Sequence, residues 1–395
     1  MRQRRLLATF LAIISLLVAP IAGARNGSEA HGGGEALAGG EARADAAVLA
    51  TGAKVADWQL QHMRDFSYIA ATAFRHDSEV PRGWVQAAFY IGLAAFADAS
   101  HEPRYLDAIL AHGRAEAWGF ESRPRHADAD ATGAVWVWAA QRTHDPAKLT
   151  PIKARFDSVL AHPSTVSLEF GTDRNSLCQD RWCWSDALFM APPAWVALSK
   201  ASGDGRYLAY ADREFWASTE YLYDPQEHLY FRDSRYFKQR DPAGRKIFWA
   251  RGNGWVFAAV ARILTDLPAD HPSRPRYLTL FKQMAAKLVQ LQGEQGYWPV
   301  SLLEPQKVPE TSGTGFFVYG LAWGVNQGLL PPGDYRPAVE RGWHALTAAV
   351  AADGKLGWVQ QVGAAPDRVR PDETQLYGVG AFLLAASQVA ILPRQ

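Results

Sequence analysis

The ten residues RWCWSDALFM, from Arg181 to Met190, run almost directly into an apolar segment, AWVAL at 194–198. They bring together an arginine, two tryptophans, one of the chain's two cysteines and the carboxylate of Asp186. An aspartate at the start of an apolar helix often caps the unpaired N–H groups there. A catalytic acid is the other interpretation of Asp186, and these residues alone leave both interpretations open.

The same arrangement recurs along the chain, because a short polar cluster repeatedly opens a helix of small and aromatic residues that a more polar helix follows. The apolar helices are expected at 85–93, 132–138, after Asp186, and at 256–264, 316–327 and 376–390, and the polar ones at 104–116, after Pro146, and at 205–223, 275–292 and 336–351. A helix over 57–74 is expected to supply the partner that the sixth apolar helix lacks. Pro192 and Pro193 predict that the third apolar helix kinks or starts late.

The alternation of these two helix types predicts the fold class. Helices that are apolar all round need cover on every side, whereas amphipathic helices need it on one face only. We therefore expect an all-α protein, an (α/α)6 barrel or six-hairpin toroid, formed by residues 48–395 as a single domain. Segments 229–232 and 296–300 are predicted to form short β-hairpin arms on loops.

The N-terminus has the pattern of a secretory signal. Three arginines within the first five residues precede an apolar run at 6–19 and the small-residue motif at 22–24, so residues 1–24 are predicted to be a signal peptide. Residues 25–47 are rich in Gly, Ala and Glu and are expected to be a disordered leader. A periplasmic or secreted location, with no membrane attachment after cleavage, follows from this prediction. Cys178 and Cys183 could then form a disulfide or remain two buried thiols.

Composition narrows the class of partner. A formal net charge of +1 gives no electrostatic bias toward nucleic acid, so none is expected as a partner. The 15 Trp, 14 Tyr and 18 Phe residues offer flat faces that suit sugar rings, although large rings also fill a helical core. His126, Asp128 and Asp130 could bind a metal, but their spacing specifies so little that a solvated helix start is the better prediction.

If the apolar helices all run the same way, their polar N-terminal clusters meet at one mouth of the barrel, where positive helix ends favour an anionic ligand. The residues expected there are Arg82, Trp84, His126, Asp128, Asp130, Asp186, Trp249, Arg251, Trp255, Thr311, Ser312, Asp372 and Glu373. Such a mouth suits an acidic sugar, because aromatic rings stack on the pyranose, Arg251 can bind a carboxylate and an aspartate can transfer a proton. Asp186 with Asp128 could also supply the two carboxylates of conventional glycoside hydrolysis.

Three motifs resemble a known family: DRWCWSDALFMAPP at 180–193, FWARGNGW at 248–255 and ETSGTG at 310–315. They are similar to glycoside hydrolase family 105, the unsaturated rhamnogalacturonyl hydrolases, which are close to the family 88 unsaturated glucuronyl hydrolases. The resemblance extends from about Trp84 to the C-terminus. It implies an (α/α)6 barrel, no metal or other cofactor, and an oligosaccharide substrate that carries a 4,5-unsaturated uronic acid at its non-reducing end.

The reaction that the resemblance implies begins with protonation of C4 of this vinyl ether. Water then captures the oxocarbenium ion at C5, and the hemiketal opens and releases the rest of the oligosaccharide. Asp186 matches the family's general acid/base, and Asp128 its second acidic position. Burial near Trp182, Trp184 and Phe189, with Asp128 as a neighbour, would keep the acid protonated near neutral pH. The residues expected to bind substrate are Arg251, Trp249, Trp255, Trp84, Trp184, Arg232, His126, Thr311 and Ser312.

Two positions depart from the pattern of many family members. Ala129 and Asp130 stand where a second Asp and a His are common, and Arg232 stands where a His is common. Both departures lie where the substrate carboxylate or the next sugar would be bound, so they bear on substrate identity. Arg232 could also be a solvated hairpin charge that pairs with Asp233.

The leading hypothesis is therefore an exported hydrolase that removes unsaturated uronic acids from oligosaccharides generated by a lyase. One alternative is a conventional glucuronidase that acts on saturated uronides, and another is a barrel that binds acidic carbohydrate without turnover. The sequence does not fix the parent polysaccharide, and the protein is expected to be a monomer or a homodimer.

Overall fold

The computed structural model of the protein describes residues 33–70, 72, 74–171, 176–304 and 309–392. The described residues from 41 onward form one compact unit. The predicted signal peptide at 1–24 lies outside the described residues. Within the described residues, the secondary structure is helical except for one two-stranded sheet, and none of the helices is both long and apolar enough to cross a membrane.

An inner ring of helices forms the centre of the fold. Its members are α2 (Trp84–Ser100), α4 (Ala127–Thr143), α6 (Ala187–Met190) with α7 (Pro192–Ser202), α9 (Ala250–Asp266), α11 (Thr311–Asn326) and α13 (Leu376–Val389). Each packs against the next in chain order, and α13 packs back against α2 to close the ring. Most of their side chains are buried whichever face they lie on, as helices covered on every side require. The predicted (α/α)6 barrel is thereby confirmed.

The ring closes through small residues. A Cβ atom on Gly92 of α2 would lie 2.2 Å from the carbonyl oxygen of Gly380 in α13. A Cβ atom on Gly380 would in turn lie 2.2 Å from the carbonyl oxygen of Ala88. The two backbones are therefore in direct contact, which only glycine permits at this distance.

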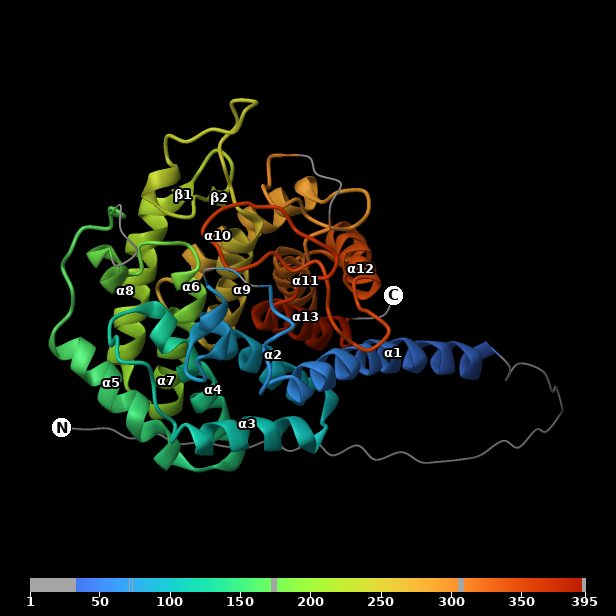
Figure 1. The fold of residues 1–395 in the computed structure, drawn as a ribbon, viewed down its shortest axis with the longest axis horizontal. Helices are drawn as coiled ribbons and strands as arrows, with labels where there is room; N and C mark the ends of the chain where they lie inside the picture. Colours follow the sequence, from blue (N-terminus) through green and yellow to red (C-terminus); the bar gives the residue numbers. More distant parts are fainter. Residues whose placement is uncertain (1–32, 71, 73, 172–175, 305–308, 393–395) are drawn as a thin grey trace, which may run out of the picture. The chain divides into compact units, whose positions relative to one another are not determined.

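An outer ring covers the inner one. It consists of α1 (Gly33–Gln61), α3 (Pro103–Ala115), α5 (Thr150–Ala161), α8 (Gly205–Leu222), α10 (Arg274–Leu291) and α12 (Pro332–Ala348). Figure 1 places α3, α5, α8 and α12 toward the periphery, with α9, α11 and α13 nearer the centre. Short elements on the connections are η1 (Arg75–Glu79), η2 (Pro146–Leu149), η3 (Leu177–Arg181), η4 (Ser234–Tyr236), β1 (Tyr223–Asp224) and β2 (Leu229–Tyr230).

The N-terminal predictions need correction. The helix expected over 57–74 instead spans Gly33–Gln61, so the described part of the expected disordered leader, 33–47, is helical. Ala, Glu, Arg and Leu are frequent here, and their high helix propensity outweighs that of the glycines. The helix still supplies the sixth outer partner, because Gly52 packs against Phe96 of α2. The indole Nε1 of Trp58 also donates to Asp353 Oδ2 at 3.1 Å.

Two further predictions concern local breaks. The third inner helix is interrupted at Ala191, and Pro192 begins α7, which confirms the expected effect of the proline pair. The hairpin arm at 229–232 is confirmed in part by β2, which pairs antiparallel with β1. The strand expected over 296–300 was wrong: Trp298 is fully buried, and its indole donates to Leu288 O at 2.7 Å. This segment packs into the core instead of extending as an arm.

Candidate active site

A cavity of about 490 Å³ opens where the inner helices begin. It is large enough for one sugar ring and part of the next, within the usual range of small-molecule sites. Its lining residues are Phe74, Asp77, Val80, Gly83, Trp84, Glu121, Arg123, His126, Asp128, Phe170, Gln179, Trp184, Asp186, Met190, Arg232, Arg235, Arg251, Val362, Gly363 and Ala364. Seven of the eleven residues predicted to form the site therefore lie on it.

Asp186 immediately precedes α6, but its side chain makes no capping hydrogen bond to that helix. Instead, the hydroxyl of Ser185 donates to Asp186 Oδ2 at 2.8 Å. The carboxylate is 14% exposed and faces the cavity. Of the two interpretations of this residue, capping is therefore excluded, and a carboxylate available to a ligand remains.

Asp128 lies in the first turn of α4, and its side chain is 19% exposed. Burial raises the pKa of Asp128 to about 7, the charges of Asp186 and Glu121 act in the same direction, and Arg123 and Arg232 oppose them. His126 caps α4, because its Nδ1 accepts from the Asp128 N–H at 3.3 Å. Burial lowers the pKa of His126 to about 3, so this ring is neutral at physiological pH.

Asp130 points away from the cavity. It accepts hydrogen bonds from Arg155 Nε at 2.7 Å and from Trp195 Nε1 at 3.0 Å. Burial raises the pKa of Asp130 to about 6 against the opposing charge of Arg155. The metal cluster considered from His126, Asp128 and Asp130 is consequently not assembled, and the described residues contain no other group of three or more His, Cys, Asp or Glu side chains placed to hold a metal ion.

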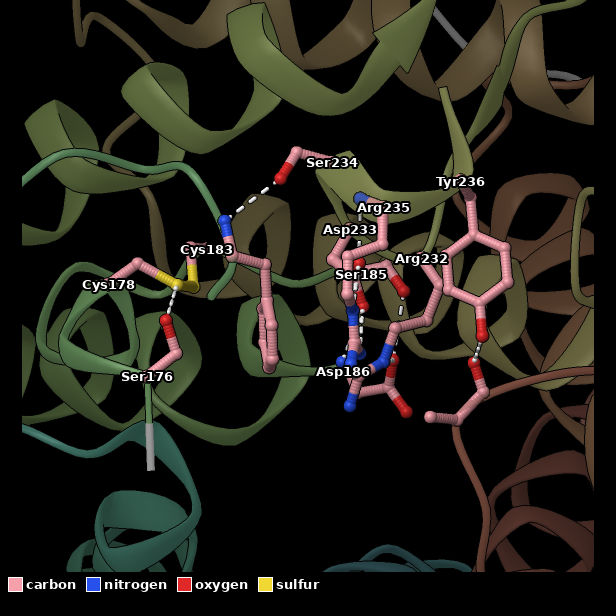
Figure 2. Close-up of polar contacts among 12 residues, drawn as sticks. Ser176, Cys178, Cys183, Ser185, Asp186, Arg232, Asp233, Ser234, Arg235 and Tyr236 are labelled. Atoms are coloured by element: carbon pink, nitrogen blue, oxygen red, sulfur yellow. Dashed lines mark hydrogen bonds and ion pairs between the residues drawn. A yellow bond between two sulfur atoms is a disulfide. The ribbon is translucent and has the colours of Figure 1, made fainter. Parts of the chain in front are cut away.

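Arg232 and Arg235 form one wall of the cavity around the buried carboxylate of Asp233 (Figure 2). Arg232 Nη1 donates to Asp233 Oδ2 at 2.7 Å, and Arg235 donates to both oxygens at 2.9 and 2.8 Å. Burial would raise the pKa of Asp233, but the hydrogen bonds and charges of the two arginines outweigh it and lower that pKa. The ring of Phe170 lies under both guanidinium groups, 5.2 Å from Arg232 Cζ and 4.1 Å from Arg235 Cζ. Pairing with Asp233 was correctly expected, but Arg232 is only 13% exposed rather than solvated.

A disulfide between Cys178 and Cys183 shapes the adjoining wall (Figure 2). The Cα atoms are 5.6 Å apart, and both side chains are buried. Gln179, inside the loop that the disulfide closes, and Trp184, just beyond it, both line the cavity. The question that the sequence left open, disulfide or two thiols, is thus answered in favour of the disulfide.

A further wall rests on the segment 357–375, which we call the strap. Arg251 is 1% exposed, and its Nη1 and Nη2 donate to the carbonyl oxygens of Gln360 and Gln361 at 2.7 and 3.0 Å. The guanidinium lies between the rings of Trp249 and Tyr377, with its Cζ 4.3 and 4.6 Å from their centroids. Arg251 reaches the cavity, but both terminal nitrogens bind the strap, in contrast to the carboxylate contact predicted from the sequence.

Four predicted substrate-binding residues do not line the cavity. Trp249 is 2% exposed and donates to Gln360 Oε1 at 2.7 Å. Thr311 donates through its hydroxyl to Gly357 O at 2.9 Å, and Ser312 donates to Glu310 Oε1 at 2.5 Å. Trp255 is fully buried, with its ring 4.2 Å from that of Phe316. The strap covers Trp249, Thr311 and, through Glu310, Ser312. Trp255 is instead enclosed by the rings of Phe189, Phe316 and Tyr377.

The other residues expected at the mouth have local partners. Arg82 pairs with Glu116 at 2.9 Å, and Asp372 and Glu373 pair with Arg370 at 3.6 and 3.4 Å. Trp84 does line the cavity, and its ring stacks on Tyr377 at 5.4 Å. Trp84 and Trp184 are therefore the two tryptophans available to a sugar ring.

Several lining residues were missed in the sequence. Arg235 could have been predicted from the sequence, because Asp233, two residues before it, caps the short helix η4 to which Arg235 belongs. Glu121 and Arg123 lie in the loop before α4, close to the predicted His126 cluster. Phe170 and the strap residues Val362, Gly363 and Ala364 had no local signal. They reach the cavity only through long-range contacts such as the hydrogen bond from Tyr236 OH to Ala364 O at 2.8 Å.

Comparison with known proteins identifies the family. The model of Glycosyl Hydrolase Family 88 matches residues 52–392. The chain belongs to this family. An unsaturated 3S-rhamnoglycuronyl hydrolase from Alteromonas sp. is 45% identical over 353 residues, which cover 86% of this chain and 85% of the relative. A protein of the same name from Formosa agariphila is 36% identical, with 78% and 84% covered.

A solved structure of a family 88 glycosyl hydrolase from Bacteroides vulgatus has the same fold. It superposes with a TM-score of 0.76 at 28% identity, covering 88% of this chain and 99% of the other. This family 88 protein is a glycoside hydrolase, as predicted. The predicted function, hydrolysis of an unsaturated uronyl residue, is likewise confirmed by the two relatives, both of which are named unsaturated rhamnoglycuronyl hydrolases.

Proposed function

We propose that this hydrolase removes an unsaturated uronyl residue linked to a rhamnose that bears a sulfate, the substrate class that the name 3S-rhamnoglycuronyl hydrolase indicates for its relatives. We also propose, from the three motifs at 180–193, 248–255 and 310–315, that the chain lies closest to the family 105 branch of these enzymes. The observation that carries the substrate proposal is the pair of arginines, Arg123 and Arg235, on the cavity.

These two arginines retain exposure that an anion can use. The side chains of Arg123 and Arg235 are 50% and 35% exposed, compared with 13% for Arg232. Planar guanidinium groups bind sulfate-like oxyanions with paired hydrogen bonds. A substrate with a carboxylate on one sugar and a sulfate on the next would present two anionic groups. Arg123 and Arg235 suit the second of these groups, the sulfate.

The proposed reaction uses the two carboxylates of the cavity. Asp186 donates its proton to C4 of the vinyl ether, so a C–H bond forms as the acid's O–H bond breaks. The resulting oxocarbenium ion at C5 is attacked by water, whose proton returns to the Asp186 carboxylate. Asp128, which burial keeps protonated to about pH 7, can donate a hydrogen bond to a sugar hydroxyl, while Trp84 and Trp184 contact the ring.

The test is a set of matched disaccharides. We expect the ultraviolet absorbance of the unsaturated ring to decay fastest for an unsaturated uronyl-rhamnose that carries a 3-sulfate. The same disaccharide without sulfate and an unsaturated uronyl-glucose should react more slowly, mainly through a higher KM. Equal kcat/KM with and without the sulfate would contradict the proposed substrate. Release of sugar from the saturated analogue at a similar rate would contradict the vinyl-ether route.

We also propose that residues 1–24 direct export from the cytoplasm. The disulfide between Cys178 and Cys183 supports this proposal, because such bonds persist mainly in oxidising compartments. Mass spectrometry of the protein recovered from periplasm and medium should give a mature N-terminus at Arg25, and a full-length chain confined to the cytoplasm would contradict export.

A further inference from the structure

We propose that Arg232 is a positioning residue for the reaction, which stabilises the Asp186 carboxylate as that carboxylate forms. The proposal rests on the vinyl-ether route of the proposed function but not on the sulfated substrate. It assigns Arg232 to the acid rather than to a sugar anion, and thereby distinguishes it from its neighbour Arg235.

The guanidinium of Arg232 is held from one side. Nη1 is fixed by Asp233, which is fully buried and also held by both donors of Arg235. The Asp233 carboxylate further accepts the backbone N–H of Arg235 at 3.0 Å. Packing against Phe170 limits movement of the plane. An arginine anchored in this way is oriented before substrate binds, so little side-chain entropy remains to be lost during the reaction.

The other edge of the guanidinium faces the acid. Nε of Arg232 is buried and has no hydrogen-bond partner among the described residues. It lies 3.9 Å from Asp186 Oδ2, which is beyond hydrogen-bond distance but close enough for a strong charge interaction. A buried N–H donor without a hydrogen-bond partner costs free energy. The position of Arg232 Nε is therefore unfavourable unless this donor gains a partner during the reaction.

The backbone also couples the two residues. The N–H of Ser185 donates to the carbonyl oxygen of Arg232 at 2.8 Å, while the Ser185 hydroxyl binds the same Oδ2 that Arg232 Nε approaches. Gly252 of α9 makes room for this hydroxyl, because a Cβ atom there would lie 2.9 Å from Ser185 Oγ. Oδ2 therefore accepts one hydrogen bond and faces the Arg232 cation, so we assign the transferred proton to Oδ1.

This geometry favours the product of the proton transfer. When the Asp186 proton passes to C4 of the substrate, the O–H bond breaks and negative charge appears on the carboxylate. A small shift from 3.9 Å to hydrogen-bond distance then satisfies Arg232 Nε. An interaction that strengthens only as charge develops lowers the barrier without stabilising the ground state equally.

Charged groups from several elements act on this pair. Asp128 from α4, with Glu121 and Arg123 from the preceding loop, share the cavity with Asp186 and Arg232. Tyr236 and Tyr377 also lie within electrostatic range of Asp186, whose charge contributes to the raised pKa of each ring hydroxyl, after the larger effect of burial. Among the described residues, Arg232 is the one arginine that forms an ion pair with Asp186 within 4.0 Å.

The experiment compares Arg232→Met with Arg245→Met, which removes an arginine from the same connection between β2 and α9 but one that pairs with Asp241 and does not line the cavity. On an unsaturated disaccharide without sulfate, Arg232→Met should lower kcat by about 10²-fold with KM nearly unchanged, as for removal of one preorganised donor. Arg245→Met should leave kcat unchanged on that substrate.

Arg232→Lys separates charge from shape and guards against misfolding of the methionine variant. It should restore part of kcat, with KM still nearly unchanged. A rise in KM with unchanged kcat in Arg232→Met or Arg232→Lys would mean that Arg232 binds a substrate anion, which would overturn the proposal. Activity of the wild type on this disaccharide tests the vinyl-ether route separately, and loss of the sulfate preference alone would affect only the proposed substrate.

Discussion

Arg232 and Arg251 both line the cavity, and their hydrogen bonds differ. Arg251 is sandwiched between two rings and donates to two backbone carbonyls. Arg232 is anchored through one nitrogen and presents a second, unpartnered one to Asp186. Both arginines come from segments that the sequence marked as functional, yet one holds a loop and the other faces the candidate acid.

The difference indicates how to separate structural from functional arginines in such a barrel. The network around Arg251 joins Trp249 and Tyr377 to Gln360 of the strap, so every contact serves to place the loop that closes the cavity. The wall around Arg232 leaves one donor and one carboxylate oriented toward the ligand space. Substitutions in the Arg232 wall should therefore lower kcat, whereas substitution of Arg251 should lower the free energy of unfolding.

The largest effect is expected at the centre of the Arg232 wall. Asp186→Asn removes the transferable proton but keeps the shape of the side chain, so kcat should fall by about 10³-fold or more. The decay of the substrate's ultraviolet absorbance measures kcat, and chemical unfolding checks that stability is kept. Asp130→Asn is the matched control, since Asp130 also lies at the start of an inner helix but binds Arg155. It should reduce stability and leave kcat nearly unchanged, whereas an Asp186→Asn variant within tenfold of wild type would rule out Asp186 as the acid.

The next prediction concerns Arg251, which holds the strap. Arg251→Met should lower the free energy of unfolding by about 3 kcal/mol, because two buried carbonyl groups lose charge-assisted hydrogen bonds. Arg232→Met should cost less, since Asp233 keeps both bonds from Arg235. Guanidinium chloride unfolding of the two variants measures the difference. An Arg251→Met variant as stable as the wild type but with a raised KM would instead favour the carboxylate contact first expected of Arg251.

The sequence was sufficient to predict the barrel and those cavity residues that lie at the starts of the inner helices. Apolar segments with small residues mark the inner helices, since Gly92 and Gly380 are where two of them touch. Asp186, Asp128, His126, Trp84 and Trp184 reach the cavity because each lies at the start of an inner helix or just before one. Helix direction alone brings such residues together, without any knowledge of the loops.

The wall formed by the strap could not be predicted from local pattern. Trp249, Thr311 and Ser312 also stand at helix starts, but the strap covers them, and its position depends on contacts between residues far apart in the chain, such as Thr311 N to Trp358 O at 2.9 Å. The extent of α1 was missed for a different reason, because a Gly-rich composition was taken as disorder although its Ala, Glu and Arg content favours a helix.

The last prediction concerns Asp128, the second carboxylate of the cavity, and is seen only as a dependence of stability on pH. Burial raises its pKa to about 7 in the folded protein, compared with about 3.9 in an unfolded chain. Between these values the folded state binds the additional proton, so the stability contributed at this site is complete below about pH 4 and is lost as pH rises toward 7, by at most about 1.4 kcal/mol per pH unit.

Asp128→Asn should remove this dependence. We expect the free energy of unfolding of the wild type, relative to the variant, to decline between about pH 4 and pH 7 and to stay level above that range. The pKa of Asp130 is raised to about 6 in both proteins, so its effect cancels in the difference. Urea unfolding at several pH values measures the slope. Arg251→Met, which changes the wall formed by the strap, should keep the wild-type dependence, whereas Arg232→Met should extend the loss to higher pH at the same limiting slope, because Arg232 opposes the rise of the Asp128 pKa. A flat difference between wild type and Asp128→Asn would mean that the Asp128 carboxylate is ionised throughout this range, and it could then not donate the proposed hydrogen bond to a sugar hydroxyl.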